Sequence, residues 1–149
     1  FSIFTQILQV MSFNKESVLK QLNDVCKNTL METLSIEYID AGEDFLTAKM
    51  PVNSKVHQPA GILHGGATVA LAESVGSAAS RMVVQDGQQV RGIEIAANHV
   101  KSIQEGWVYA TAKIVHKGRT THLWEIRITD EKGQLISLCK LTNIVLSVK

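Results

Sequence analysis

The stretch from Gln58 to Arg81 restricts the fold of this 149-residue chain more than any other part of the sequence. It contains no proline after Pro59, and small and aliphatic residues fill a segment that is too long for a strand. This composition predicts a helix that begins near Gly65 and ends near Val83. Its side chains are small on nearly every face, so the helix can only pack against something that comes very close. A sheet wrapped around the helix fits that requirement best.

Glu73 is the only ionised side chain between His64 and Arg81. A carboxylate on an otherwise apolar helix loses hydration at a cost of several kcal/mol, and this loss favours its protonated form. Such a group is suited to act as a general base or as a carboxylate nucleophile. Ser77 lies one turn further on the same face, where its hydroxyl could hold a water or the carboxylate. The competing interpretation is a helix glutamate paired with a basic residue of a second chain.

The start of the predicted helix is a second candidate site. The sequence His64-Gly65-Gly66 presents unpaired backbone N–H groups that can polarise a carbonyl oxygen. Gly65 and Glu73, however, are separated by ~12 Å along a helix that rises ~1.5 Å per residue. One reacting carbonyl needs both groups within ~3.5 Å. The arrangement therefore requires two antiparallel copies of the helix, as in a two-fold dimer.

These motifs carry a resemblance to a known family. The residues that match are Gln58, His64-Gly65-Gly66, Ala72-Glu73-Ser74 and the segment 92–102. They are similar to those of the hotdog-fold acyl-CoA thioesterases, most closely the group that acts on 4-hydroxybenzoyl-CoA and dihydroxynaphthoyl-CoA. The resemblance covers about Leu34 to Leu146. It implies an α+β hotdog fold, a homodimer or a homotetramer built as a dimer of dimers, and no metal or redox cofactor, with coenzyme A as part of the substrate.

The resemblance also implies roles for the matching residues. The Gly65 amide would polarise the thioester carbonyl, and Glu73 of the partner would attack it or activate water. His64 and Gln58 would position the reacting group. Without the resemblance, His64 is equally well a helix-start residue that bonds a backbone group, and Gln58 an exposed loop residue. Because phenylacetyl-CoA thioesterases of this fold usually carry aspartate at the Glu73 position, glutamate favours an aromatic acyl group attached directly to the thioester.

Two local basic clusters could bind the anionic coenzyme A. They span residues 98–102 and 117–122 and fall at expected strand ends, where backbone N–H groups, hydroxyls and cations can converge on phosphates. In the family, residues of these regions contact the nucleotide and the pantetheine arm, although residues 119–122 depart from the family's usual sequence. A solvated surface is the alternative for both. The candidate substrate-binding residues are Ser77, His99, Lys101, Ser102, Arg119 and Thr120.

The composition restricts which kinds of molecule this chain is expected to bind. A formal net charge of +1 gives no broad basic field, which argues against nucleic acid or an anionic membrane. Cys26, in an expected helix, and Cys139, in an expected strand, are too few for a disulfide framework or a metal site. Residues 1–10 lack the pattern of a signal peptide. The cytoplasm is therefore the expected compartment.

The remaining pattern predicts the other elements. We expect residues 1–14 to be an N-terminal extension, with Met11 as a candidate natural start, and residues 15–149 to form one domain. The expected elements besides the central helix are a helix over 15–31, strands over 35–39, 45–50, 90–100, 107–116, 121–129 and 135–148, and a loop over 52–63 that carries Gln58. Short connections favour antiparallel pairing, which predicts an α+β fold with one sheet curved around one helix.

Two other functions remain open at this point. A hotdog dehydratase acting on 3-hydroxyacyl thioesters is one, although this chain lacks the hydratase signature and the usual Asp–His pair. A non-catalytic acyl-CoA sensor is the other. Hotdog sensors that regulate transcription carry a basic DNA-binding extension, and the segment before Leu34 is short and weakly charged.

Overall fold

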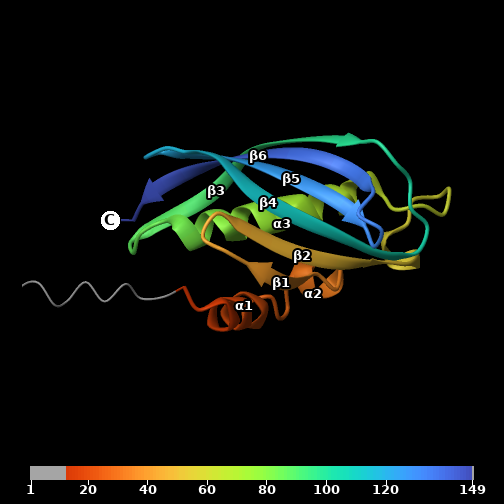
Figure 1. Cartoon of the computed structure of the whole chain (residues 1–149), viewed down its shortest axis with the longest axis horizontal. Helices are drawn as coiled ribbons and strands as arrows, with labels where there is room; N and C mark the ends of the chain where they lie inside the picture. Colours follow the sequence, from red (N-terminus) through yellow and green to blue (C-terminus); the bar gives the residue numbers. More distant parts are fainter. Residues whose placement is uncertain (1–12, 149) are drawn as a thin grey trace, which may run out of the picture.

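The structure, a computed structural model, describes residues 13–148, so Met11 and most of the expected extension lie outside the described residues. One sheet curves around one long helix, and two short helices lie beside the edge formed by β1 and β2 (Figure 1). The elements are α1 (Lys15–Asp24), α2 (Leu30–Thr33), β1 (Glu37–Ala41), β2 (Phe45–Val52), η2 (Ser54–Val56), α3 (Gly65–Val83), β3 (Gln88–His99), β4 (Gly106–Lys117), β5 (Thr121–Asp130) and β6 (Leu135–Ser147). The predicted α+β architecture is confirmed.

The six strands form a single antiparallel sheet in the order β1-β2-β4-β5-β6-β3. Burial alternates along β2 and β5, as expected for strands with one face on the core. Within the described part of the chain, β3 pairs with β6 on one side only and forms one edge of the sheet. Its twelve residues are exposed or half-buried throughout.

The central helix α3 begins at Gly65 and ends at Val83, as predicted. Its small residues permit close contact with the sheet. At Gly76 a Cβ atom would lie 2.7 Å from Leu141 Cδ2 and 3.4 Å from Ile126 Cδ1. A side chain at position 76 would have to push Leu141 aside, so glycine permits this close contact between α3 and β6. No helix within residues 13–148 has the length and apolar character needed to cross a bilayer.

The predicted helix over 15–31 was wrong in its second half. α1 ends at Asp24, and Asn28 adopts a left-handed conformation with φ of 59° before α2 begins at Leu30. Asparagine tolerates that conformation better than most residues, and a helix cannot continue through it. Cys26 consequently lies in the turn between α1 and α2.

Strand boundaries also differ from the prediction by one or two residues. Ser35 has φ of 55°, which excludes it from the first strand, and β1 begins at Glu37. The second strand was expected over 45–50 but continues to Val52. Pro51 is tolerated because β1 extends along β2 only as far as Lys49, so the proline needs no ladder partner on that side.

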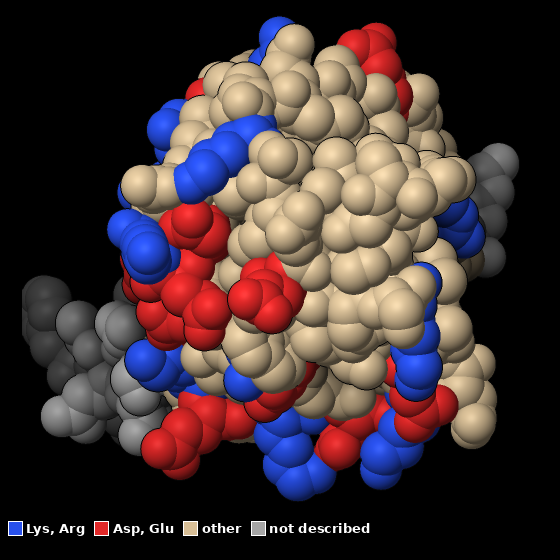
Figure 2. Space-filling view, turned by 90° about the vertical axis from the view of Figure 1, so that its right-hand side faces the viewer, with Lys and Arg blue, Asp and Glu red and all other residues tan. Residues whose placement is uncertain are grey.

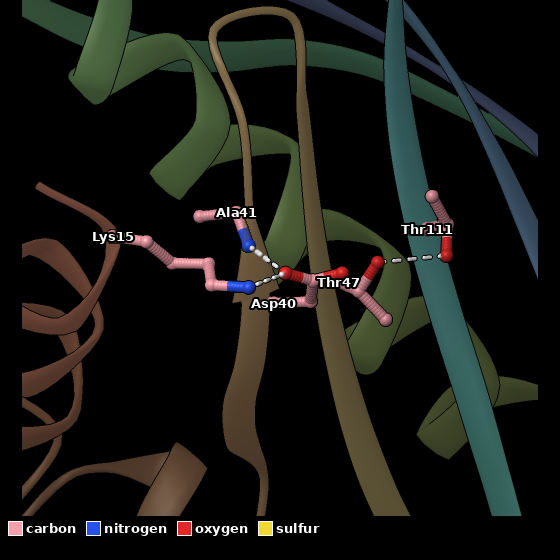
Figure 3. A network of polar contacts seen from close by, with 5 residues as sticks. All are labelled: Lys15, Asp40, Ala41, Thr47 and Thr111. Carbon is pink, nitrogen blue, oxygen red and sulfur yellow. Dashed lines mark hydrogen bonds and ion pairs between the residues drawn. The ribbon is translucent and has the colours of Figure 1, made fainter. Parts of the chain in front are cut away.

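Polar contacts tie α1 to the sheet (Figure 3). Lys15 Nζ lies 3.1 Å from Asp40 Oδ1 of β1, and the same oxygen accepts a hydrogen bond from the Ala41 amide at 3.0 Å. Deeper in the sheet, Thr47 and Thr111 link β2 to β4 through their hydroxyls at 2.9 Å. At the other end of α1, the Asn23 side chain bonds both the amide and the carbonyl of Tyr38. The helix is thus anchored to β1 at both ends.

Candidate active site

A cavity of about 350 Å³ opens beside the start of α3, and we call it the Gly65 cavity. It brings together several predicted residues from segments far apart in the sequence. Its lining includes Gln58, Gly65, His99, Lys101 and Ser102. This end of the molecule, where β3 ends and α3 begins, presents a broad uncharged face with charged side chains mainly along its margins (Figure 2).

Local hydrogen bonds shape the loop that precedes α3. His64 is the N-cap of the helix, and its Nδ1 accepts a hydrogen bond from the Gly66 amide at 2.7 Å. The backbone-bonding interpretation of His64 therefore applies in this structure. Gln58 Oε1 accepts a hydrogen bond from the Ala60 amide at 2.8 Å, which holds the side-chain carbonyl and leaves the NH₂ group as its ligand-binding end.

His99 lies directly against the helix start. A Cβ atom on Gly65 would come within 2.9 Å of His99 Nε2, so only glycine lets the ring approach this closely. The other ring nitrogen, Nδ1, is 3.1 Å from Ser137 Oγ, and this hydroxyl donates to the Asn98 carbonyl. Ser137 thus holds the ring through Nδ1. His99 Nε2 is then the nitrogen that faces the Gly65 cavity.

Glu73 lines a different cavity, of about 360 Å³, which we call the Glu73 cavity. Ser77 lines it as well, as expected from their shared helix face. The rest of its lining is largely apolar and comes from α1, α2, β1 and α3: Leu22, Val25, Met31, Tyr38, Ser74, Ala78 and Arg81. An acid side chain thus stands at the edge of an apolar space.

The expected burial of Glu73 was wrong for the single chain, in which its side chain is exposed. The carboxylate lies against β3, where a Cβ atom on Gly92 would be 2.7 Å from Glu73 Oε1. Glu73 thus contacts the edge strand and is still exposed in the single chain. Any desolvation of this carboxylate must come from a ligand or from another subunit.

The second basic cluster is not brought to either cavity. Lys117, Arg119 and His122 line a separate cavity at the far end of α3. Thr120 is exposed, and its carbonyl accepts a hydrogen bond from the Val145 amide at 2.8 Å. The two basic clusters thus lie apart within one chain, and the assignment of Arg119 and Thr120 to coenzyme A binding stays a prediction.

Sequence reasoning missed a buried polar cluster on the sheet side of α3, which we call the Ser80 cluster. Ser80 Oγ lies 2.6 Å from Trp124 Nε1, 2.7 Å from Asn143 Nδ2 and 3.1 Å from His122 Nδ1. All four side chains are at most 2% exposed. No local motif could have indicated the cluster, because its members come from α3, β5 and β6.

Comparison with known proteins identifies the family of this chain. The family model described as "Thioesterase superfamily" matches residues 60–137. The chain is 42% identical over 136 residues to "Proofreading thioesterase EntH" of Cronobacter turicensis, a match that covers 91% of this chain and 99% of that relative. This chain belongs to the thioesterase superfamily. Its membership confirms the predicted hotdog fold and identifies a thioester hydrolase.

Solved thioesterases have the same fold. A mutant of thioesterase PA1618 from Pseudomonas aeruginosa superposes with a TM-score of 0.85 at 42% identity, over 87% of this chain and 94% of that one. A glutamine-to-alanine mutant of the thioesterase SAV0944 from Staphylococcus aureus superposes with a TM-score of 0.76 at 38% identity, over 78% of this chain and 97% of that one. A glutamate-to-alanine mutant of SAV0944 has also been solved.

Proposed function

We propose that this thioesterase hydrolyses acyl-CoA, preferentially with an aromatic acyl group, at a site shared by two subunits. The Gly65 amide of one subunit polarises the thioester carbonyl, and Glu73 of the other attacks the carbonyl carbon or activates a water. Gln58 and His64 position the reacting group. The protein acts as a homodimer, or as a homotetramer made of two such dimers.

This proposal rests on the contacts that Glu73 and Gly65 each make with β3. Glu73 meets β3 at Gly92, and Gly65 meets it at His99. An antiparallel pairing of β3 with the same strand of a second copy, centred on Ala96, sets Gly92 opposite the partner subunit's His99 when the bulge between Gly92 and Glu94 is counted. Neighbouring strands lie about 4.8 Å apart. The same pairing therefore brings Glu73 of one subunit beside the Gly65 end of the other.

The free edge of β3 supports such a pairing. Long unpaired strand edges bind further strands unless they are protected. β1, at the opposite edge of the sheet, has only five residues and is flanked by α1, whereas β3 has twelve. Ile93 on β3 is 58% exposed, a value that suits a residue covered by a partner.

The apolar and basic surroundings support an acyl-CoA substrate. The Glu73 cavity offers an apolar space for the acyl group, and His99, Lys101 and Ser102 offer polar groups for the coenzyme A arm. Lys101 Nζ already lies 3.5 Å from Asp130 Oδ2. Hydrogen bonds from the Gln134 and Lys132 amides, together with Lys101, lower the pKa of Asp130, so this carboxylate remains charged at neutral pH. We expect Lys101 to contribute less to phosphate binding than a free lysine would.

The solved relatives add a supporting observation. In SAV0944, the glutamine and the glutamate that were replaced by alanine are fifteen residues apart in the sequence. Gln58 and Glu73 have the same separation. The two residues to which we assign the chemistry thus match the residue types and the spacing of positions that were altered in a thioesterase.

The proposal is tested with purified protein, a panel of benzoyl-, phenylacetyl- and straight-chain acyl-CoAs, and a reagent that detects the released thiol. We expect turnover that is fastest with benzoyl-CoA and falls about 10²–10⁴-fold in Glu73→Ala. Full activity of Glu73→Ala would refute its catalytic role. Formation of an enoyl product would favour the dehydratase, and binding without turnover would favour the sensor.

A further inference from the structure

A further cavity, of about 370 Å³, continues along α3 beyond the Glu73 cavity. We call it the Met82 cavity, since Met82 and Val84 line it together with Val18 of α1. Among residues 13–148, Leu22 and Arg81 are the ones that line both cavities. Residues shared by two adjacent cavities form the partition between them.

We propose that Leu22 and Arg81 limit the length of the acyl group that this enzyme accepts. This inference rests on the proposed function and assigns a specificity-determining role within the same site. An acyl group whose carbonyl lies at Glu73 extends along α3 and ends at the partition. Removal of the partition joins the two cavities and admits a longer chain.

The two residues block the passage in different ways. Leu22 is a half-buried side chain of α1 that fills the apolar side. Arg81 lies eight residues after Glu73, a rise of ~12 Å along α3. Its guanidinium donates a hydrogen bond to the Gln88 carbonyl at 2.9 Å, which holds the cation in place. A hydrocarbon chain that passed this point would displace water from a charged group, which is unfavourable.

The position of Leu22 is fixed by its neighbour in the sequence. Asn23 donates to the Tyr38 carbonyl and accepts from the Tyr38 amide, both at 2.9 Å. The Lys15–Asp40 ion pair holds the other end of α1 (Figure 3). Because Tyr38 itself lines the Glu73 cavity, the partition and the cavity wall form one anchored unit. A fixed partition discriminates by size more sharply than a mobile one.

The test compares chain-length profiles of variants of α1. Leu22→Ala is paired with Leu19→Ala, a control in the same helix that is also half-buried and lines neither cavity. For each protein, kcat/KM is measured with butanoyl-, octanoyl-, dodecanoyl- and hexadecanoyl-CoA and divided by its value for butanoyl-CoA. We expect Leu22→Ala to raise the relative value for the longest chains at least about tenfold, whereas Leu19→Ala keeps the wild-type profile.

Leu22→Phe and Arg81→Gln keep the inference testable if Leu22→Ala folds poorly. The larger side chain should move the optimum to shorter chains, and loss of the cation should move it to longer ones. A profile that stays unchanged in all three variants, with active enzyme, overturns the partition but leaves the proposed function intact. Absence of turnover with every acyl-CoA in the wild-type protein overturns both.

Discussion

Polar side chains on the two faces of α3 have opposite surroundings. On the face toward the Glu73 cavity, Glu73 and Ser77 border open space. On the face toward the sheet, Ser80 is fully buried and its oxygen has three partners. Polar groups on the first face remain available to a substrate, whereas those on the second are consumed in holding the helix on the sheet. The contrast between Ser77 and Ser80 therefore separates function from stability.

The bonding of Ser80 also fixes the state of His122. The Ser80 oxygen accepts hydrogen bonds from Trp124 and Asn143, so its own proton is donated to His122 Nδ1. His122 must be neutral at that nitrogen. Burial, followed by the charges of Lys117 and His116, lowers the pKa of His122 and favours the same state.

The largest expected difference between the two faces of α3 is in the free energy of unfolding. Ser80→Ala leaves buried donors of Trp124 and Asn143 without this acceptor, and we expect it to lower the free energy of unfolding by about 2–4 kcal/mol. Ser77→Ala is the matched control and should change it by less than about 0.5 kcal/mol while lowering kcat. Urea denaturation measures both. Equal losses of stability in the two variants would contradict the distinction.

A second effect concerns the helix start. Gly65→Ala would place a methyl group 2.9 Å from His99 Nε2, and the ring would have to move. We expect kcat/KM to fall about 10–10²-fold, as for a displaced catalytic geometry. Circular dichroism and the unfolding midpoint should remain close to wild type, because alanine favours helix formation. Unchanged kinetics would mean that close contact between His99 and the helix start is unnecessary.

A third effect is a pH dependence of stability. Since the pKa of His122 is lower in the folded chain than its unfolded value of about 6.5, the unfolded state binds more protons below that pH. The stability that neutral His122 contributes to the folded chain is fully present above pH 6.5. This stability is lost as the pH falls through the pKa of His122 in the folded chain. The slope of unfolding free energy against pH should become shallower in His122→Gln. An identical slope in both proteins would exclude His122 as its source.

The smallest expected effect is at Ser137, which bonds His99 but lies outside the helix. Ser137→Ala should lower kcat a few-fold, because a single neutral hydrogen bond contributes about 1 kcal/mol. Steady-state kinetics with benzoyl-CoA measures this change. A loss as large as that of Glu73→Ala would indicate a direct catalytic role for Ser137.

How far the sequence predicted the molecule depended on how local each signal was. The bounds of α3 were predictable, because helix composition acts within a few positions. The break at Asn28 was not, because its left-handed conformation is only one of those open to asparagine. Pro51 misled the prediction since a strand's tolerance of proline depends on where its neighbour ends.

In the candidate site, too, the residues of local motifs were predictable and those that depend on strand pairing were not. Gln58, Gly65 and Glu73 lie in one contiguous motif and could be named in advance. That His99 reaches Gly65, whereas Arg119 lies at the other end of α3, depends on the pairing of β3 with β6 and of β5 with β6. The partition at Leu22 and Arg81 and the Ser80 cluster each join elements that no sequence pattern connects.

The most direct test of a site shared between subunits is complementation. Glu73→Ala and Gln58→Ala chains, each nearly inactive alone, are co-expressed with different tags at equal amounts. A mixed dimer carries one site with both substitutions and one with neither, so the random mixture should regain about one quarter of wild-type activity. Isolated mixed dimers should have about half. Mixed dimers that stay as inactive as their parents would contradict a site built from two subunits.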